Sequence, residues 1–218
     1  MSNSTSFDLN SLIKESKETV VNPKGHFTAL PVTGGLGEPV LKALIYSVVA
    51  GVIVFLWGVL GLGGQAGVFG AGIGGMALAW TIIGAMAGLF IGAVILLIIS
   101  AICKGNTDFE ACLRVTASVM VVLPISALLG FFSGISPTIG ALVSLCVNFF
   151  ALYLLYYGLT ETLKANPATT RIVMYVLAAI LVVAMIVGLR AQKKLNNYMD
   201  EMGQVNRTEL PVDRKSLT

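Results

Sequence analysis

The chain has 218 residues, of which 56% are hydrophobic and only 11% are charged, and its mean hydropathy is +0.87. A typical soluble domain carries about 25% charged residues, so this composition excludes a soluble enzyme, a disordered chain and a nucleic-acid-binding protein. The net charge of +3 is too small to indicate a polyanionic partner. The sequence therefore predicts a protein whose solvent is the lipid bilayer.

Five segments are long and apolar enough to cross a membrane as helices, which requires about 20 residues at 1.5 Å each. They are expected at 43–62, 76–102, 112–132, 138–159 and 171–189. We therefore predict an all-α, polytopic membrane bundle with five transmembrane helices. Its parts are a cytoplasmic or interfacial segment (1–40), a membrane domain (41–190) and a polar, charged tail (191–218). Pro124 predicts a kink in the third helix, because proline removes one backbone hydrogen bond.

The segment before the first span has a helical pattern of its own. Leu9, Leu12, Ile13 and Val20 lie near one face of a helix, and Asn22-Pro23 ends the pattern. This segment is either a short helix on the membrane surface or a loosely ordered terminus.

The distribution of lysine and arginine predicts the orientation in the membrane. The N-terminal segment and the second and fourth loops carry eight basic residues, the first and third loops carry none, and the tail carries six. The loops place the N-terminus in the cytoplasm and the C-terminus on the opposite side by the positive-inside rule. The basic tail opposes this orientation, but we give the loops more weight because long tails translocate largely regardless of charge.

Residues for catalysis or metal binding are scarce. The single histidine, His26, lies outside the spans, and no aspartate lies within one, which excludes a two-histidine metal motif and an intramembrane aspartyl protease. Gly70, Gly72 and Gly75 match G-x-G-x-x-G, but they join two membrane spans rather than a strand and a helix. We therefore predict no catalytic residue, no cofactor and no metal.

Small residues repeat at helical spacing in two spans. The positions are Gly84, Gly88 and Gly92 in the second span and Gly140, Ser144 and Asn148 in the fourth. In lipid, such faces let two helix backbones approach closely. Three interpretations are open: packing within one subunit, an interface between subunits, or a substrate path.

Three polar side chains near or within the spans suggest a second kind of site. Asn148 lies near mid-membrane and needs a hydrogen-bond partner, whereas Arg114 and Glu161 lie near span ends. One interpretation brings Arg114, Asn148 and Glu161 into a common polar crevice. In the other, Arg114 extends along the helix to reach water.

Several short stretches of the chain follow a familiar pattern. They are Asn22-Pro23-Lys24-Gly25-His26-Phe27, Gly37-Glu38-Pro39, Lys104-Gly105-Asn106-Thr107-Asp108-Phe109, Leu113-Arg114-Val115, Leu123-Pro124 and Tyr153-Leu154-Leu155-Tyr156-Tyr157-Gly158-Leu159. Together they resemble three parts of the Yip family of Ypt/Rab-interacting membrane proteins: the segment leading into the membrane domain, the third helix with the loop before it, and the fourth helix. The resemblance covers about residues 20–190.

This resemblance implies a cytosolic N-terminus, five spans and no catalytic residue. The eukaryotic branch of the family works in ER–Golgi vesicle traffic with Rab GTPases, usually as homo- or hetero-oligomers. The chain departs from that branch in its short segment before the membrane and its long charged tail, and it is more similar to the bacterial branch. Binding to a Rab-type GTPase is therefore not carried over.

We predict a non-enzymatic protein of the bacterial cytoplasmic membrane that organises membrane, scaffolds or acts as a trafficking-type partner. Its partners are the lipid bilayer and other membrane proteins, as a homo- or hetero-oligomer, and not nucleic acid. The alternative is a transporter or channel subunit for a small solute or lipid. Pro124, Asn148 and the glycine-rich stretch 63–75 motivate that alternative, because broken helices and buried polar groups often line transport paths.

Overall fold

The computed structural model describes residues 9–61 and 74–208, without the side chains of 9, 74–81, 192, 193 and 195–208. Every regular element within these residues is a helix. Five helical segments are long and apolar enough to cross a membrane: Gly37–Val59, Ile82–Ile102, Phe109–Ile135, Pro137–Thr162 and Pro167–Ala191. The prediction of an all-α bundle with five transmembrane helices is confirmed.

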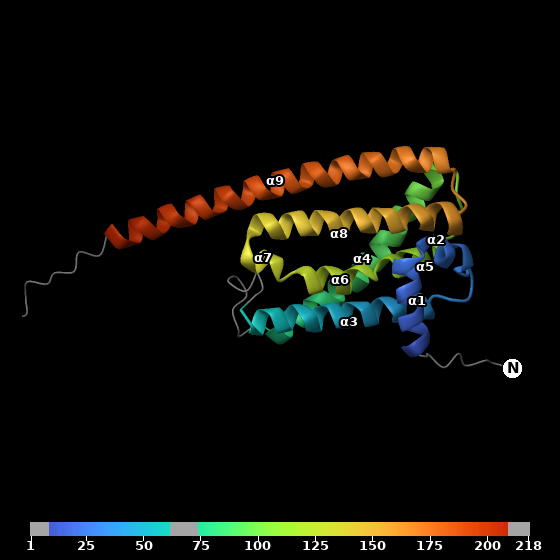
Figure 1. Ribbon diagram of the computed structural model, residues 1–218, viewed down its shortest axis with the longest axis horizontal. Coiled ribbons are helices and arrows are strands. Elements are labelled where there is room, and N and C mark those ends of the chain that lie inside the picture. The colour runs from blue at the N-terminus through green and yellow to red at the C-terminus, as the bar shows by residue number, and fades with distance from the viewer. Residues whose placement is uncertain (1–8, 62–73, 209–218) are drawn as a thin grey trace, which may run out of the picture.

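The long helices α3 (Gly37–Val59), α8 (Pro137–Tyr157) and α9 (Pro167–Thr208) lie along a common direction in Figure 1, and α4 (Gly74–Ile102) passes behind them. Helix α4 packs against α3, and α9 packs mainly against α8. Helix α9 continues well past the expected end of the fifth span at 189, and its C-terminal part projects beyond the bundle in Figure 1.

The other end of the bundle, on the right of Figure 1, carries two short helices and several loops. We call it the polar end; it comprises α1 (Leu9–Val21), α2 (Pro23–Ala29) and the loops at 30–36, 103–108 and 163–166. The predicted N-terminal helix is therefore present as α1. It crosses the direction of the membrane helices instead of extending them (Figure 1).

The third span is not one kinked helix but three consecutive helices. They are α5 (Phe109–Val119), α6 (Val122–Leu129) and α7 (Phe132–Ile135). Pro124 explains the first break, since it has no N–H to donate to the Met120 carbonyl; Leu123 N donates to that carbonyl instead, at 2.9 Å. Near the second break, Trp57 Nε1 of α3 donates to the Ala127 carbonyl at 3.0 Å. The Ala127 carbonyl also accepts from Gly130 N at 3.1 Å, so the bond from Trp57 ties α3 to the end of α6.

The fourth span ends in a wider turn, the π-helix η1 (Gly158–Thr162). Leu163 N donates to the Gly158 carbonyl at 3.0 Å, which is the i to i+5 spacing of a π-helix. Gly158 lies so close to α5 that a Cβ at this position would collide with Val115. Glycine is therefore needed here for the contact between α8 and α5.

Two loops at the polar end bond to each other reciprocally. Asn106 N, between α4 and α5, donates to the Leu163 carbonyl at 2.6 Å, and Asn166 N, between η1 and α9, donates to the Cys103 carbonyl at 2.9 Å. The side chain of each asparagine also accepts from the backbone N–H two residues later, at 2.9 Å in both loops. These loops fasten the α4–α5 and α8–α9 hairpins together.

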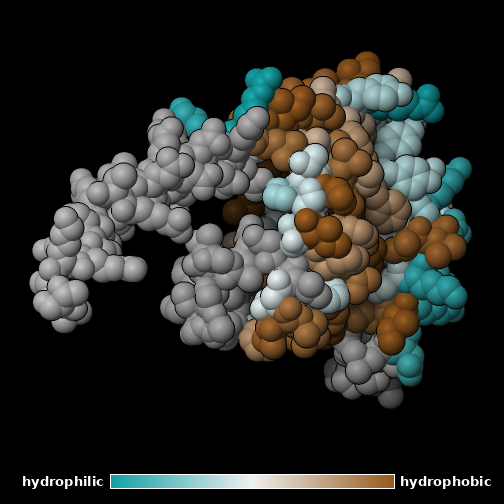
Figure 2. All heavy atoms as spheres, turned by 60° about the vertical axis from the view of Figure 1, so that its left-hand side comes forward, coloured by the Kyte–Doolittle hydropathy of each residue, from teal (hydrophilic) through white to brown (hydrophobic). Residues whose placement is uncertain are grey.

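Fully buried large side chains are frequent at and near the polar end. They include Phe27, Leu96, Leu113, Leu154, Leu159 and Leu163. The surface of the molecule differs between the polar end and the rest of the bundle. In Figure 2, many hydrophilic side chains lie along the right-hand edge, beside a mostly hydrophobic surface. The rest of the bundle exposes apolar side chains, as expected of a surface that lipid covers.

Candidate functional site

Arg114 on α5 is buried at the polar end and has three partners. Its side chain is 3% exposed; Nη1 bonds to Glu38 Oε2 at 2.9 Å, and Nε bonds to Glu110 Oε1 at 3.2 Å. Nη2 donates to the Gly35 carbonyl at 3.0 Å. One interpretation of the sequence expected Arg114 to extend along the helix into water. The structure shows that it does not. It binds the start of α3 and the loop before it.

Two consecutive glycines allow the backbone to wrap around Arg114. Both have positive φ, +139° at Gly34 and +94° at Gly35, a region that side chains with a Cβ rarely adopt. A Cβ at Gly34 would also lie 2.7 Å from Nη2 of Arg114. Gly35 N completes the arrangement by donating to Glu110 Oε1 at 2.6 Å.

A second buried cation, Lys42 of α3, holds the N-terminal helix. Its side chain is 6% exposed, and Nζ bonds to Glu15 Oε2 of α1 at 2.9 Å. Lys42 Nζ also donates to Ser118 Oγ of α5, at 3.5 Å. Ser16, next to Glu15, shares a hydrogen bond of 2.7 Å with the Tyr46 hydroxyl of α3. These bonds anchor α1 across the first turns of α3.

His26 lies beside this pair, on α2. It is buried, and its Nε2 has no hydrogen-bond partner within the part of the chain that the structure describes. The pKa of His26 is lowered from 6.5 to about 4, mainly by burial and then by the nearby Lys42, while Glu15 acts in the opposite direction. The imidazole is therefore neutral at pH 7, which suits its position beside a buried ammonium group.

The three residues of the expected crevice have different partners. Asn148 Nδ2 donates to the carbonyl of Ser144, on its own helix, at 2.8 Å, and its side chain is exposed. Glu161 Oε2 accepts from Thr28 Oγ1 at 3.2 Å, and Arg114 binds the acidic groups given above. No hydrogen bond or ion pair joins any two of the three among the described residues, so the structure does not bring them together.

The glycine series of α4 divides into an inner and an outer part. A Cβ at Gly92 would lie 3.0 Å from Cγ2 of Thr116, so this position packs against α5 inside the chain. At Gly84 and Gly88, no described atom outside the helix lies within 4 Å of such a Cβ, and both positions are exposed. The first two glycines therefore face outward.

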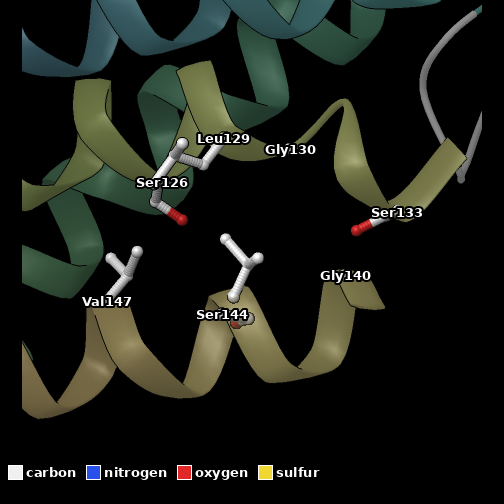
Figure 3. Close-up of a pocket in the computed structure, with 8 residues that line it drawn as sticks. Ser126, Leu129, Gly130, Ser133, Gly140, Ser144 and Val147 are labelled. Atoms are coloured by element: carbon white, nitrogen blue, oxygen red, sulfur yellow. The ribbon is translucent and has the colours of Figure 1, made fainter. Parts of the chain in front are cut away.

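The series on α8 lies beside a small cavity. Gly140 lies against Ser133 of α7 so closely that a Cβ would overlap it. Next to this contact is a space of about 90 Å³ between α6–α7 and α8, toward which the side chains of Ser126 and Ser133 extend in Figure 3. Ser144 also lines it, and its volume is enough for about three water molecules at roughly 30 Å³ each.

Comparison with known proteins identifies the chain. A family model described as the Yip1 domain matches residues 17–189. The chain belongs to the Yip family. No curated protein and no solved structure matches it. The predicted family is thus confirmed, and a Yip-family chain with five membrane helices is a multi-pass integral membrane protein.

In this Yip-family chain, the charged side chains Lys42 and Arg114 of this region are held in ion pairs. No group of three His, Cys, Asp or Glu side chains among the described residues is placed to hold a metal ion. The Lys42 and Arg114 groups instead join the N-terminal segment to α3 and α5 by charge-assisted hydrogen bonds.

Reasoning from sequence missed the roles of Lys42 and Glu15. A signal was present: Lys42 lies inside the first apolar helix, where an unpaired ammonium group is costly. A search for its partner would have pointed to the acidic residues of the helix before it. The glycine pair Gly34-Gly35 was a weaker signal, for a tight turn before the membrane.

Proposed function

We propose that this chain is a non-enzymatic scaffolding or membrane-organising protein that assembles with membrane partners through the outer face of α4. The observation that carries this proposal is the open space in front of Gly84 and Gly88. The hydrophobic effect does not drive helices together within lipid, because lipid tails are as apolar as the helices. Close backbone contact at small residues is therefore a main source of helix–helix affinity. An outward glycine pair offers that contact to another helix.

The surroundings of the glycine pair support the same conclusion. Ile83 and Ile91 are 59% and 60% exposed, and Ala87 between them is also exposed. Together these side chains form a shallow apolar face with a small-residue centre, on which a partner helix can seat. Gly92, farther along the same helix, packs inside the chain, so the outward part of the glycine series is limited to Gly84 and Gly88.

We further propose that the polar end faces the cytoplasm of a bacterial cell and that α9 ends on the opposite side of the cytoplasmic membrane. The polar end carries Lys14, Lys17, Lys24, Lys104 and Lys164, and an excess of basic residues marks cytoplasmic loops. The odd number of spans supports opposite sides for the two ends.

The transport alternative has less support. The cavity beside α8 has room for only a few water molecules, and Asn148 is not among the residues that line it. Asn148 is satisfied by its own helix instead. We therefore favour assembly over conduction.

The test replaces the glycine pair with leucine, as Gly84→Leu/Gly88→Leu. Because nothing described lies near these positions, the fold of the single chain should tolerate the change. We expect the oligomer seen by native mass spectrometry in mild detergent, or the co-purified membrane partner, to be lost. Gly188→Leu is the matched control, since Gly188 is an exposed glycine of α9 with equally open surroundings. Assembly that survives the double substitution would contradict the proposal.

A further inference from the structure

Helix α1 lies across the membrane helices at the level where α3 begins. Its inner face is fixed by Leu12 and Thr19, which are buried, and by the Glu15–Lys42 and Ser16–Tyr46 bonds. The direction of α1 is steeply inclined to that of α3 in Figure 1. Since α3 crosses the bilayer, a helix that lies across its first turns runs along the membrane surface.

The outer face of α1 changes in character from one edge to the other. At 100° per residue, the order around this face is Ile13, Lys17, Val21, Lys14 and Glu18. Ile13 and Val21 are 66% and 73% exposed, and the two lysines and the glutamate are exposed as well. Ile13 thus forms an apolar edge and Glu18 an acidic edge, and the middle carries the two lysines with the apolar Val21 between them.

The surface of α3 next to this helix is apolar and exposed. Leu41, Val48 and Val49 flank the positions that hold α1, and all three are exposed on a membrane-spanning helix. Apolar side chains exposed at this depth are covered by acyl chains. Lipid head groups must therefore lie at the level of α1.

We propose that the outer face of α1 binds the anionic lipid surface of its leaflet. Ile13 enters the upper acyl-chain region, Lys17 and Lys14 contact phosphate groups, and Glu18 stays in water. Lysines on an interfacial helix keep their stems on apolar surface and their ammonium groups at the phosphates. The negative potential of an anionic leaflet attracts each of them. An acidic soluble protein would neutralise the lysines equally well, but it would not explain the apolar edge or the orientation along the bilayer.

The first experiment compares the full-length chain in nanodiscs of phosphatidylcholine with and without phosphatidylglycerol. We expect backbone amides of residues 9–21 to exchange hydrogen about tenfold more slowly when the anionic lipid is present. Lys14→Gln/Lys17→Gln should abolish this difference. Lys104→Gln/Lys164→Gln should preserve it, because those lysines are exposed at the same end but outside α1. Equal exchange in both lipids, or an equal effect of the two double variants, would overturn the proposal.

The second experiment separates lipid from a soluble occupant. Ile13→Cys and Glu18→Cys are labelled in the same nanodiscs with a water-soluble maleimide, and labelling of the native cysteines in the unsubstituted chain is subtracted. Lipid contact predicts slow labelling at position 13 and fast labelling at position 18. Equal rates would show that the apolar edge is in water and would also overturn the proposal. Neither experiment depends on assembly through α4.

Discussion

At the polar end, Arg114 and Lys42 are buried and paired with acidic groups, whereas along α9 large apolar side chains such as Ile172 and Val183 are exposed. In the most apolar part of each span, 33% of the residues of α3 are buried inside the chain, compared with 6% for α9. The polar end is thus organised like a small soluble core, while α9 depends on lipid for most of its contacts. The two regions of one chain face two different solvents.

This difference locates the specific interactions of the fold. Lipid accepts almost any apolar side chain, so the exposed faces of α9 place few constraints on sequence. A buried cation at the polar end needs a particular partner at a particular distance, and removing the partner leaves a charge that water cannot reach. Single substitutions should therefore have large effects at the polar end and small effects on α9.

The largest effect is expected at Arg114. Arg114→Ala removes the group that joins Glu38, Glu110 and the Gly35 carbonyl, and Glu110 keeps only its bond from Gly35 N. We expect a loss of about 3 kcal/mol in the free energy of unfolding, because three charge-assisted hydrogen bonds are lost and the buried side chain leaves a cavity. Thermal unfolding in detergent micelles, followed by circular dichroism, measures this loss.

Arg171→Ala is the control for α9. Arg171 is exposed, and its contact is a long hydrogen bond of 3.4 Å to the Tyr156 hydroxyl. Its removal should change the free energy of unfolding by less than about 0.5 kcal/mol. Similar losses for the two substitutions would show that the polar end and α9 do not differ in the way described.

The same division explains what the sequence could predict. Length and hydropathy were sufficient for five spans, because the bilayer imposes one thickness on every helix. Pro124 predicted an interruption, since the missing N–H acts locally. The lost helical bond and a second break near Gly130 divide the expected kinked helix into three helices, and no proline or other sequence signal predicted the second break.

The polar end was harder to predict because its partners are distant in sequence. Arg114 pairs with Glu38 from another helix, and Lys42 pairs with Glu15, from which helix α2 and the loop at 30–36 separate it. Apolar spacing alone placed Leu12 and Ile13 on one face of α1, but docking turns Glu15 and Ser16 inward and leaves Ile13 exposed. Spacing on α4 likewise grouped three glycines without indicating that only Gly92 faces the chain's own helices.

A smaller effect is expected at Glu15. Glu15→Gln leaves Lys42 with a neutral partner in a buried position, which should weaken the docking of α1 by about 2 kcal/mol. Hydrogen exchange of residues 9–21 should accelerate, while exchange in α9 should stay the same. Glu18→Gln is the matched control, because Glu18 is an exposed glutamate of the same helix. If the control accelerates exchange as much, the ion pair does not hold α1.

The smallest effect, about 1 kcal/mol, is expected from pH through His26. The pKa of His26 is about 4 in the docked structure and 6.5 when the side chain is in water. Above pH 6.5 both forms are neutral, and the docked state has its full stability. As the pH falls below 6.5, the undocked form binds a proton that the docked form does not, so docking weakens progressively until the docked form also protonates near pH 4. A change from pH 7.5 to 5.5 should therefore favour release of α1 and α2 without affecting the contact between α8 and α9.

Because His26 is the single histidine of the chain, NMR can follow its imidazole signal without assignment of other residues. A titration midpoint well below 6.5 in the folded protein is expected, together with a drop in melting temperature between pH 7.5 and 5.5 that His26→Gln reduces. A midpoint near 6.5 would place the ring in water and would remove the difference in proton binding on which the pH effect rests. In that case the polar end would be open to solvent at α2, and its contrast with α9 would rest on the two ion pairs alone.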